Sequence, residues 1–412
     1  MYDFVLLGAT GFTGTLCAKF ITNNYPTDIK WSIAGRSYDK LETLAEELML
    51  LQPDRRQPDI ECVDFGKDDL ELLVKQTRLV INGVGPYHRH STPVVEACAR
   101  FGTHYVDFTT ETLWVKELTE KYAEMAQASG ALLIPAISPC APSDLLAYLI
   151  ATKIRDSCGT GTSEVVCSGK LDIKAMSSGS FNTVLDSVET YGPWWYLSRD
   201  SWILSLRSKP RRVQRKPWVT RLFGYRYAPE LGSLTTSFTA SGNESIVHRS
   251  SSQSPEIYGP NFHFNEYTPA KGFVSAFIVH ILTIFGVILI SFSPIRSLLR
   301  GPLRPINSEP DIAEARRSEW VKYHAVGKAD NEGSHGKFRV YASLARAGAL
   351  YEFTALLACV GARVLLETRI EAEKEGRQFS GKGGIMTPSA LGVQYVERLK
   401  EAGVEIDVVS LG

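Results

Sequence analysis

The chain has 412 residues, of which 44% are hydrophobic and 22% are charged, and its 45 basic residues balance its 45 acidic ones. This length exceeds what one hydrophobic core usually serves, so we expect two domains, and the apolar fraction excludes a disordered or fibrous chain. The seven cysteines are scattered without a C-x-x-C pair, which is typical of reduced thiols in an intracellular protein. We expect no cleaved signal peptide, because the chain opens directly into an apolar strand.

The zero net charge conceals an uneven distribution. Between Ser201 and Pro229 there are eight basic residues and no acid, and between Lys271 and Ser308 there are four more basic residues and no acid. The remaining chain carries 33 basic and 45 acidic residues. We therefore expect one basic region on an otherwise acidic protein.

The first predicted element is a strand at Phe4–Leu7, which runs into a glycine-rich turn and then a helix. In such a turn the first glycine allows the tight bend, the second lets a pyrophosphate approach, and the third lets the helix pack on the strand. The N-terminus of the helix then faces the phosphates with unpaired N–H groups. We expect the cofactor-binding residues of this turn to be Gly8, Thr10, Gly11, Phe12, Thr13 and Gly14.

A second strand, Trp31–Ala34, leads into Gly35, Arg36 and Ser37. An Asp or Glu at this place, about twenty residues past the last glycine, would bind a ribose 2′-hydroxyl. Arg36 stands there instead, and a guanidinium matches a 2′-phosphate in charge and geometry. Arg36 and Ser37 therefore predict NADP(H) as the cofactor. The alternative is a solvated surface arginine.

A third strand, Leu79–Asn82, ends in a loop that we expect to pass under the nicotinamide ribose, with Tyr87 pointing toward the ring. Further strands at 104–107 and 131–135 lead to Glu111 and Asp144. Strands that alternate with helical stretches are typical of βαβ units and indicate an NAD(P)-binding Rossmann domain at 1–145. The cofactor-binding residues of the third loop are Gly83, Val84, Gly85 and Pro86.

This ordered set of motifs resembles the saccharopine-dehydrogenase-like oxidoreductases, whose members include saccharopine reductases and bacterial trans-acting enoyl reductases. The resemblance implies an α/β fold with NAD(P) binding, a second α/β (α+β) domain at 146–385, and a C-terminal helix and strand at 386–412 that pack back on the Rossmann domain. The motifs are G-A-T-G-F-T-G at 8–14, A-G-R at 34–36, N-G-V-G-P-Y at 82–87, P-S-D-L at 142–145, V-H-R-S at 247–250, Y-G-P-N-F at 258–262 and M-T-P-S-A-L-G at 386–392.

Two positions depart from the family pattern. Ser91 stands where relatives commonly have a glycine, and Pro139 stands where they commonly have the Asp of G-F-D-S. A mechanism that relies on that carboxylate cannot operate here. We expect an altered substrate site, and an inactive protein is left open.

The segment 272–292 contains 21 residues without a Lys, Arg, Asp or Glu, which is long enough to cross a bilayer. Sequence on both sides of it belongs to one fold, so we favour in-plane insertion, a shallow hairpin or an apolar cavity wall over a complete span. A buried core helix is the structural alternative. Together with the basic and tryptophan-rich stretch 207–226, the segment predicts a membrane or lipid-droplet surface as partner and location rather than nucleic acid.

The resulting prediction is an intracellular NADPH-dependent oxidoreductase that reduces the activated C=C of an apolar lipid, polyketide-like or acyl-carrier-linked substrate, as a tailoring enzyme of secondary metabolism does. Tyr87 is the candidate proton donor, with Asp144 and Glu111 as orienting groups. The alternatives are an imine or carbonyl reductase and a catalytically silent nucleotide-binding scaffold at a lipid surface. His88 and His90 have no cysteine or carboxylate near them in sequence, so no metal site is expected. A homodimer is left open.

Overall fold

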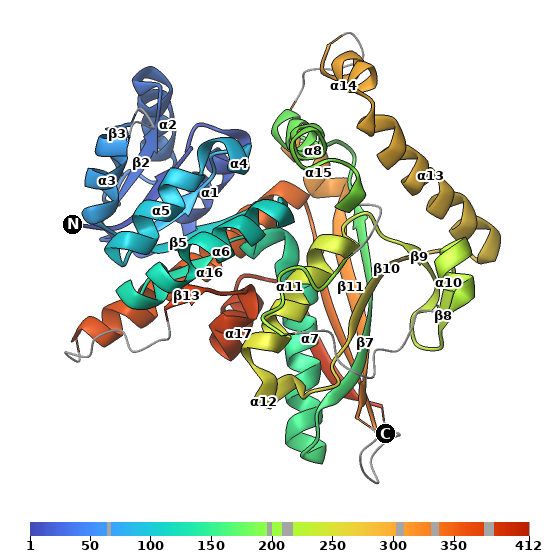
Figure 1. Ribbon diagram of the computed structural model, residues 1–412. Coiled ribbons are helices and arrows are strands. Elements are labelled where there is room, and N and C mark those ends of the chain that lie inside the picture. The colour runs from blue at the N-terminus through green and yellow to red at the C-terminus, as the bar shows by residue number, and fades with distance from the viewer. Residues whose placement is uncertain are drawn as a thin grey trace. The chain divides into compact units, whose positions relative to one another are not determined.

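The computed structural model describes residues 1–63, 67–195, 200–207, 217–301, 309–330, 338–374 and 383–411, which form two compact units (Figure 1). The first unit comprises residues 1–139 and 350–402, and the second comprises residues 140–349 and 403–412. Each unit has its own seven-stranded sheet with helices packed on it. The predicted fold class, a Rossmann domain followed by a second α/β domain, is confirmed.

The sheet of the first unit is parallel throughout, in the order β13-β6-β5-β4-β1-β2-β3. The chain reverses its direction of winding between β1 and β4, which lie side by side, and a ligand crevice in such a sheet opens at the carboxyl ends of these two strands. The strands are β1 (Tyr2–Leu7), β2 (Trp31–Gly35), β3 (Asp59–Cys62), β4 (Thr77–Asn82), β5 (His104–Asp107), β6 (Leu132–Ile134) and β13 (Gly384–Ile385).

Continuous apolar runs make the central strands, because both faces of a parallel sheet are covered by helices. Phe4–Leu7 of β1 are at most 1% exposed. The helices of this unit are α1 (Phe12–Asn24), α2 (Tyr38–Leu51), α3 (Lys67–Lys75), α4 (Tyr87–His90), α5 (Thr92–Phe101), α6 (Thr112–Ser129), α16 (Leu350–Lys374), the 3₁₀ helix η1 (Pro388–Leu391) and α17 (Gly392–Glu401).

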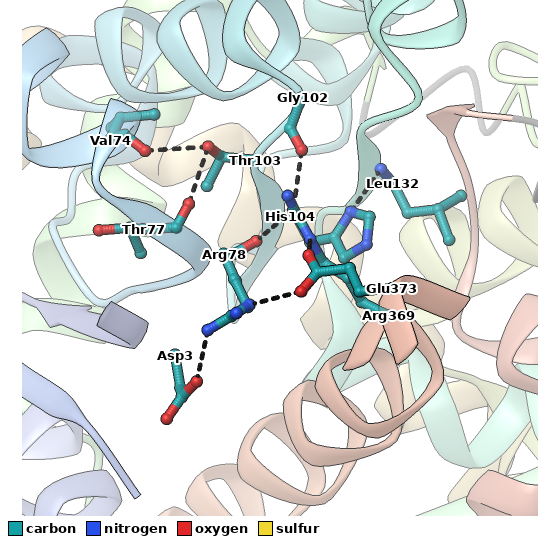
Figure 2. Close-up of polar contacts among 10 residues, drawn as sticks. All are labelled: Asp3, Val74, Thr77, Arg78, Gly102, Thr103, His104, Leu132, Arg369 and Glu373. Carbon is teal, nitrogen blue, oxygen red and sulfur yellow. Dashed lines mark hydrogen bonds and ion pairs between the residues drawn. The ribbon is translucent and has the colours of Figure 1, made fainter. Parts of the chain in front are cut away.

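Helix α16 returns to the first unit late in the chain and packs its apolar face against α1 and the sheet. Figure 2 shows how its C-terminal half is held. Arg369 donates to the backbone oxygens of Arg78 and Gly102, both at 2.9 Å, and Arg78 in turn bridges Glu373 at 3.0 Å and Asp3 at 2.8 Å. These contacts attach α16 to the starts of β1 and β4, the edge opposite the ligand crevice.

Figure 2 also shows His104 at the start of β5, where its Nδ1 accepts a hydrogen bond from the N–H of Leu132 at 3.1 Å. The side chain is 1% exposed. Burial and the nearby Arg369 cation lower the pKa of His104 to about 3, so the imidazole is neutral. His104 therefore has a structural role between β5 and β6.

The sheet of the second unit is mixed, in the order β14-β12-β11-β7-β10-β9-β8, and among the pairs of described strands only β7 and β10 are parallel. Its strands are β7 (Thr162–Asp172), β8 (Arg226–Ala228), β9 (Gly232–Thr236), β10 (Phe264–Pro269), β11 (Trp320–Ala329), β12 (Arg339–Ala347) and β14 (Glu405–Ser410). The helices are α7 (Ile137–Cys158), α8 (Ser178–Tyr191), α10 (Trp218–Phe223), α11 (Ala240–Gln253), α12 (Pro255–Tyr258), α13 (Phe273–Ser291), α14 (Ser293–Arg300) and α15 (Ile312–Ser318).

The predicted domain limits 1–145, 146–385 and 386–412 differ from the observed division in two places. Helix α16, which falls within 146–385, belongs to the first unit because its apolar face completes the core there. Strand β14, which was expected to pack on the Rossmann domain, pairs with β12 from Val340 to Ala345 and extends the second sheet. The returning helix α17 does belong to the first unit, as expected.

The apolar segment 272–292 forms helix α13, and only 17% of its most apolar window is buried. Within the described residues it is the one helix long and apolar enough to cross a membrane. A fully buried core helix, one of the alternatives for this segment, is therefore wrong. Most of the basic run, residues 208–216, and Arg304 lie outside the described residues.

Candidate functional site

The glycine-rich turn lies between β1 and α1, at the carboxyl end of the strand. Gly8 has φ +76°, and a Cβ there would lie 2.9 Å from the backbone carbon of Gly83 in the loop after β4. A Cβ on Gly14 would lie 2.2 Å from the backbone oxygen of Gly8. Glycine is therefore required at both positions, first for a left-handed turn beside the β4 loop and then for close packing of α1.

Helix α1 begins at Phe12 with Gly11 as its N-cap, and no side chain caps its first turn. No acidic residue lies in that turn. The backbone N–H groups and the helix dipole therefore face the crevice without a competing carboxylate, which suits a pyrophosphate. Gly11 is exposed, and Thr10, Phe12 and Thr13 are partly exposed around it.

Arg36 and Ser37 follow β2, the strand beside β1. The Arg36 side chain is exposed and makes no hydrogen bond or ion pair with other described residues, and the Ser37 hydroxyl does not cap α2, although Ser37 is its N-cap residue. Both side chains are thus available at the carboxyl end of β2. This position fits a 2′-phosphate on the cofactor ribose.

A buried polar network shapes the loop after β4, which contains Gly83, Val84, Gly85 and Pro86. The amide of Asn82 donates to Ser91 Oγ at 2.8 Å and to the Tyr105 hydroxyl at 2.9 Å, while its oxygen accepts from Val84 N at 3.1 Å. Ser91 Oγ donates to the backbone oxygen of Val84 at 2.7 Å. Ser91, the departure from the family glycine, therefore holds the cofactor loop, a role that its sequence position did not indicate.

Asp107, at the end of β5, completes this network. It accepts from the Tyr105 hydroxyl at 2.6 Å, Thr109 N at 3.0 Å and Ala136 N at 2.7 Å. The last contact holds Ala136 at φ 57°, an unusual left-handed conformation for alanine. Desolvation raises the pKa of Asp107 to about 7, although these hydrogen bonds oppose the shift.

Tyr87 does not have the orientation expected of a proton donor. Its ring is buried against Trp114 and Phe108, with centroids at 5.7 and 6.4 Å, and its hydroxyl donates weakly to the backbone oxygen of Asn82 at 3.4 Å. Burial raises the pKa of the Tyr87 hydroxyl well above its ordinary value. This geometry does not favour Tyr87 as the proton donor, because apolar packing inside the first unit holds its hydroxyl inward.

Glu111, which was expected to orient Tyr87, orients His88 instead. Its buried carboxylate accepts from the backbone N–H groups of Tyr87 at 2.8 Å and His88 at 2.9 Å, and its Oε2 lies 2.5 Å from Nδ1 of His88. A carboxylate only accepts, so Nδ1 carries the hydrogen of this contact. A buried His–Glu pair thus lies just after the predicted nicotinamide loop, with the His88 side chain 6% exposed.

Comparison with known proteins also indicates a dinucleotide-binding domain at the N-terminus. Residues 4–134 match the model of the saccharopine dehydrogenase NADP binding domain. The first domain belongs to this family.

Two full-length relatives of this chain are trans-acting enoyl reductases. That of Mycobacterium tuberculosis is 28% identical and that of Mycobacterium leprae 27% identical, each covering 100% of this chain and 98% of the relative. Saccharopine dehydrogenase (L-Glu forming) from Saccharomyces cerevisiae superposes with a TM-score of 0.57 at 13% identity, over 99% of both chains, and so shares the fold. The chain is an NAD(P)-dependent oxidoreductase.

Asp144, the third predicted catalytic residue, belongs to the second unit of this oxidoreductase, whereas Tyr87 and Glu111 belong to the first. It is fully buried and accepts from Ser250 Oγ at 2.5 Å. His248 and Arg249 of the same V-H-R-S motif bind backbone groups at Ser201, Phe264 and Leu204. The motif therefore stabilises the second unit around α11, where it binds the buried Asp144 through Ser250.

The position of the missing family carboxylate, Pro139, lies near the start of α7, next to Ser138, whose hydroxyl donates to the backbone oxygen of Thr354 at 2.8 Å. Ser138 thus binds α16, and Pro139 supplies no carboxylate at this position. Among the described residues, no group of three or more His, Cys, Asp or Glu could hold a metal ion.

Proposed function

We propose that this oxidoreductase uses NADPH to reduce the activated C=C of an enoyl substrate of the lipid or polyketide-like class. The full-length similarity to two trans-acting enoyl reductases supports this reaction class. The observation that carries the proposal is the His88–Glu111 pair after β4, because it supplies the acid that such a reduction needs beside the cofactor loop.

NADPH is preferred to NADH in this proposal. Arg36 is exposed at the end of β2 without an ion pair to other described residues, so its guanidinium is available for a 2′-phosphate. An acidic residue, which would favour the ribose 2′-hydroxyl of NADH, is absent from positions 36 and 37.

The chemistry assigned to this chain is protonation. NADPH, when bound, supplies the hydride for the β-carbon of the enoyl group. Nε2–H of His88 donates a proton to the α-carbon as the enolate electrons return to form the new C–H bond, and neutral His88 takes a proton back from solvent. Glu111 is a positioning residue, because it holds Nδ1–H and stabilises the imidazolium before transfer.

The test is NADPH oxidation by the purified full-length protein, measured by absorbance with a medium-chain enoyl thioester and, in parallel, with imine and carbonyl substrates. We expect turnover with the enoyl thioester and saturated thioester as product. Turnover with imines or carbonyls alone would show that the protein is an imine or carbonyl reductase and not an enoyl reductase. Tight NADPH binding without turnover on any of the three would favour a catalytically silent scaffold.

A further inference from the structure

Helix α13 lies at the outside of the second unit (Figure 1), and its exposed side is broadly apolar. Large hydrophobic side chains between 36% and 69% exposed lie along it. At 100° per residue, most of them occupy one continuous half of the helix circumference. They are Phe273, Val274, Phe277, Ile278, Ile281, Leu282, Phe285 and Ile288, with Phe292 just past the helix end. A contiguous apolar face of this kind marks an interaction surface.

The opposite, narrow side of α13 packs on its own unit and is fixed there. Its buried residues are Ala276, His280 and Val287. Thr235 Oγ1 of β9 donates to the backbone oxygen of Ala276 at 2.7 Å, and Thr236 Oγ1 lies 2.7 Å from Nδ1 of His280. The N-terminal half of the helix is therefore attached to β9, and the exposed face of α13 does not complete the core of this unit.

Helix α10 extends the apolar face near the N-terminal end of α13. Phe223 of α10 packs against Phe273 and Phe277, with ring centroids at 5.5 and 5.6 Å. Trp218 and Leu222 on the same short helix are 67% and 63% exposed. A tryptophan at the margin of an apolar surface is typical of proteins that sit at headgroup depth in a bilayer.

The sheet excludes a complete crossing of the membrane by α13. Strand β10 precedes the helix and β11 follows it, and both pair with β7. A helix that spanned the bilayer would place these two neighbours of β7 on opposite sides, and the contacts of Thr235 and Thr236 with α13 would break. Helix α13 must therefore stay on the surface of the second unit and cannot cross a bilayer.

We propose that the exposed face of α13, together with Trp218 and Leu222, inserts in the plane of a bilayer that contains anionic lipid. The charge pattern favours lipid over a second copy of this chain. No acid occurs in 201–229 or in 271–308, and Arg221 and Lys271 are exposed beside the apolar face. In a symmetric dimer these cations would lie near the same cations of the second copy and repel them. Anionic lipid headgroups would attract them instead.

Other cations near α13 are already used inside the unit. Arg296 binds the backbone oxygens of Ile290 and Ser291, at 3.0 and 2.7 Å, and so caps the C-terminus of the helix. Arg300 pairs with Asp186 and Glu189 of α8 at 2.5 and 2.6 Å. These contacts hold the end of α13 close to α8, which keeps the helix parallel to the surface of its unit.

The test is flotation of the full-length protein with vesicles of phosphatidylcholine alone or with about one quarter phosphatidylserine. The variant Ile281→Ser/Leu282→Ser/Phe285→Ser removes three exposed apolar side chains, and Leu50→Ser/Leu51→Ser/Leu72→Ser is the matched control on exposed positions of the first unit. We expect wild type and control to float, more strongly with phosphatidylserine, and the α13 variant to lose binding by at least about tenfold. Unchanged thermal melting and NADPH binding of the variant would show that it is folded.

Two further measurements separate the remaining outcomes. Because the chain has seven tryptophans, quenching by brominated lipids is compared between the wild type and Trp218→Phe, and the difference is assigned to Trp218. A Trp218-dependent quenching that is stronger with bromine near the headgroup than near the bilayer centre supports in-plane insertion, and the reverse order overturns it. Absence of flotation with either vesicle overturns the proposal. A dimer that dissociates in the α13 variant, without flotation of the wild type, would assign the surface to a second copy of the chain.

Discussion

Nδ1 of His88 lies 2.5 Å from Oε2 of Glu111, and the same carboxylate accepts the backbone N–H groups of Tyr87 and His88. One buried acid therefore fixes both the start of α4 and the orientation of the imidazole that follows it. Hydrogen bonds to charged groups contribute more than neutral ones, so Glu111 makes the His88 ring a rigid element of the loop after β4.

This arrangement predicts that His88→Ala lowers kcat for enoyl reduction by about 10²- to 10⁴-fold, the usual contribution of a general acid. NADPH affinity should change little, because His88 follows the predicted cofactor-binding stretch 83–86. Added imidazole should restore part of the turnover. His90→Ala, an exposed histidine two residues further on, is the matched control and should keep wild-type turnover. An undiminished kcat in His88→Ala would contradict the role of His88.

The exposed position of Arg36 at the end of β2 leads us to expect that it sets the preference for NADPH over NADH. Arg36→Ala should lower the ratio of NADPH to NADH affinity by about 10- to 100-fold, because a charge-assisted contact to the 2′-phosphate is lost while contacts common to both cofactors remain. Titration of protein fluorescence with each cofactor measures the ratio. Arg56→Ala removes an exposed arginine elsewhere in the first unit and should leave the ratio unchanged. The same ratio in Arg36→Ala as in wild type would exclude Arg36 from the 2′-phosphate site.

The sequence sufficed for the Rossmann strands whose side chains are buried on both faces. Runs such as Phe4–Leu7 and Leu79–Ile81 are apolar throughout, so composition alone reveals them. Strand β3 was missed because Asp59–Cys62 lies at the sheet edge and carries polar residues. Strand β14 was placed in the wrong sheet because the pairing of a short strand depends on distant residues.

The polar part of the site was less predictable. Tyr87 follows the predicted cofactor loop in sequence, yet a helical turn and two aromatic neighbours direct its hydroxyl inward, and the proposed acid–base group is the adjacent His88. The signal for His88 was its place one residue after Tyr87, but its partner Glu111 lies 23 residues away and meets it only in the folded sheet. Likewise, the composition of α13 fits a buried helix as well as an exposed one, and only the packing distinguishes them.

The contact between Gly14 and the backbone oxygen of Gly8 predicts a strong effect of one methyl group. Gly14→Ala would place a Cβ 2.2 Å from that oxygen, so α1 must move away from β1. We expect a loss of about 2 kcal/mol or more in the free energy of unfolding, together with weaker NADPH binding. Gly286→Ala is the control, because a Cβ at this helical glycine meets nothing within 4 Å and should be neutral or stabilising. Equal melting temperatures of the two variants would contradict the packing argument.

The raised pKa of Asp107 leads us to expect that its protonation at low pH stabilises the first unit. Its pKa is raised from 3.8 to about 7, so between these values the folded state binds a proton that the unfolded state does not. The contribution of Asp107 to the free energy of unfolding should therefore fall by about 2 kcal/mol as pH rises from 5 to 7. Asp107→Asn keeps an acceptor for Thr109 and Ala136 and removes the titration, so the free energy of unfolding of this variant in urea should lack the Asp107 contribution to the pH dependence. The same pH dependence in variant and wild type would assign it to other groups.

The pKa shift of His104 makes stability depend on pH in the opposite direction to that of Asp107. The pKa of His104 is lowered from 6.5 to about 3, so in this range the unfolded state binds a proton that the folded state excludes, and stability falls as pH decreases below 6.5. Between about pH 4 and 6.5 the effects of His104 and Asp107 oppose one another, and the wild type should show a shallow pH dependence there. His104→Asn keeps an acceptor for Leu132 N but cannot be protonated, so it should gain about 2 kcal/mol relative to its own stability at pH 6.5 when acidified to pH 5, whereas Asp107→Asn should lose about as much. Measuring urea midpoints of both variants across this range tests the pair, and parallel slopes in the two would show that these residues do not set the pH dependence.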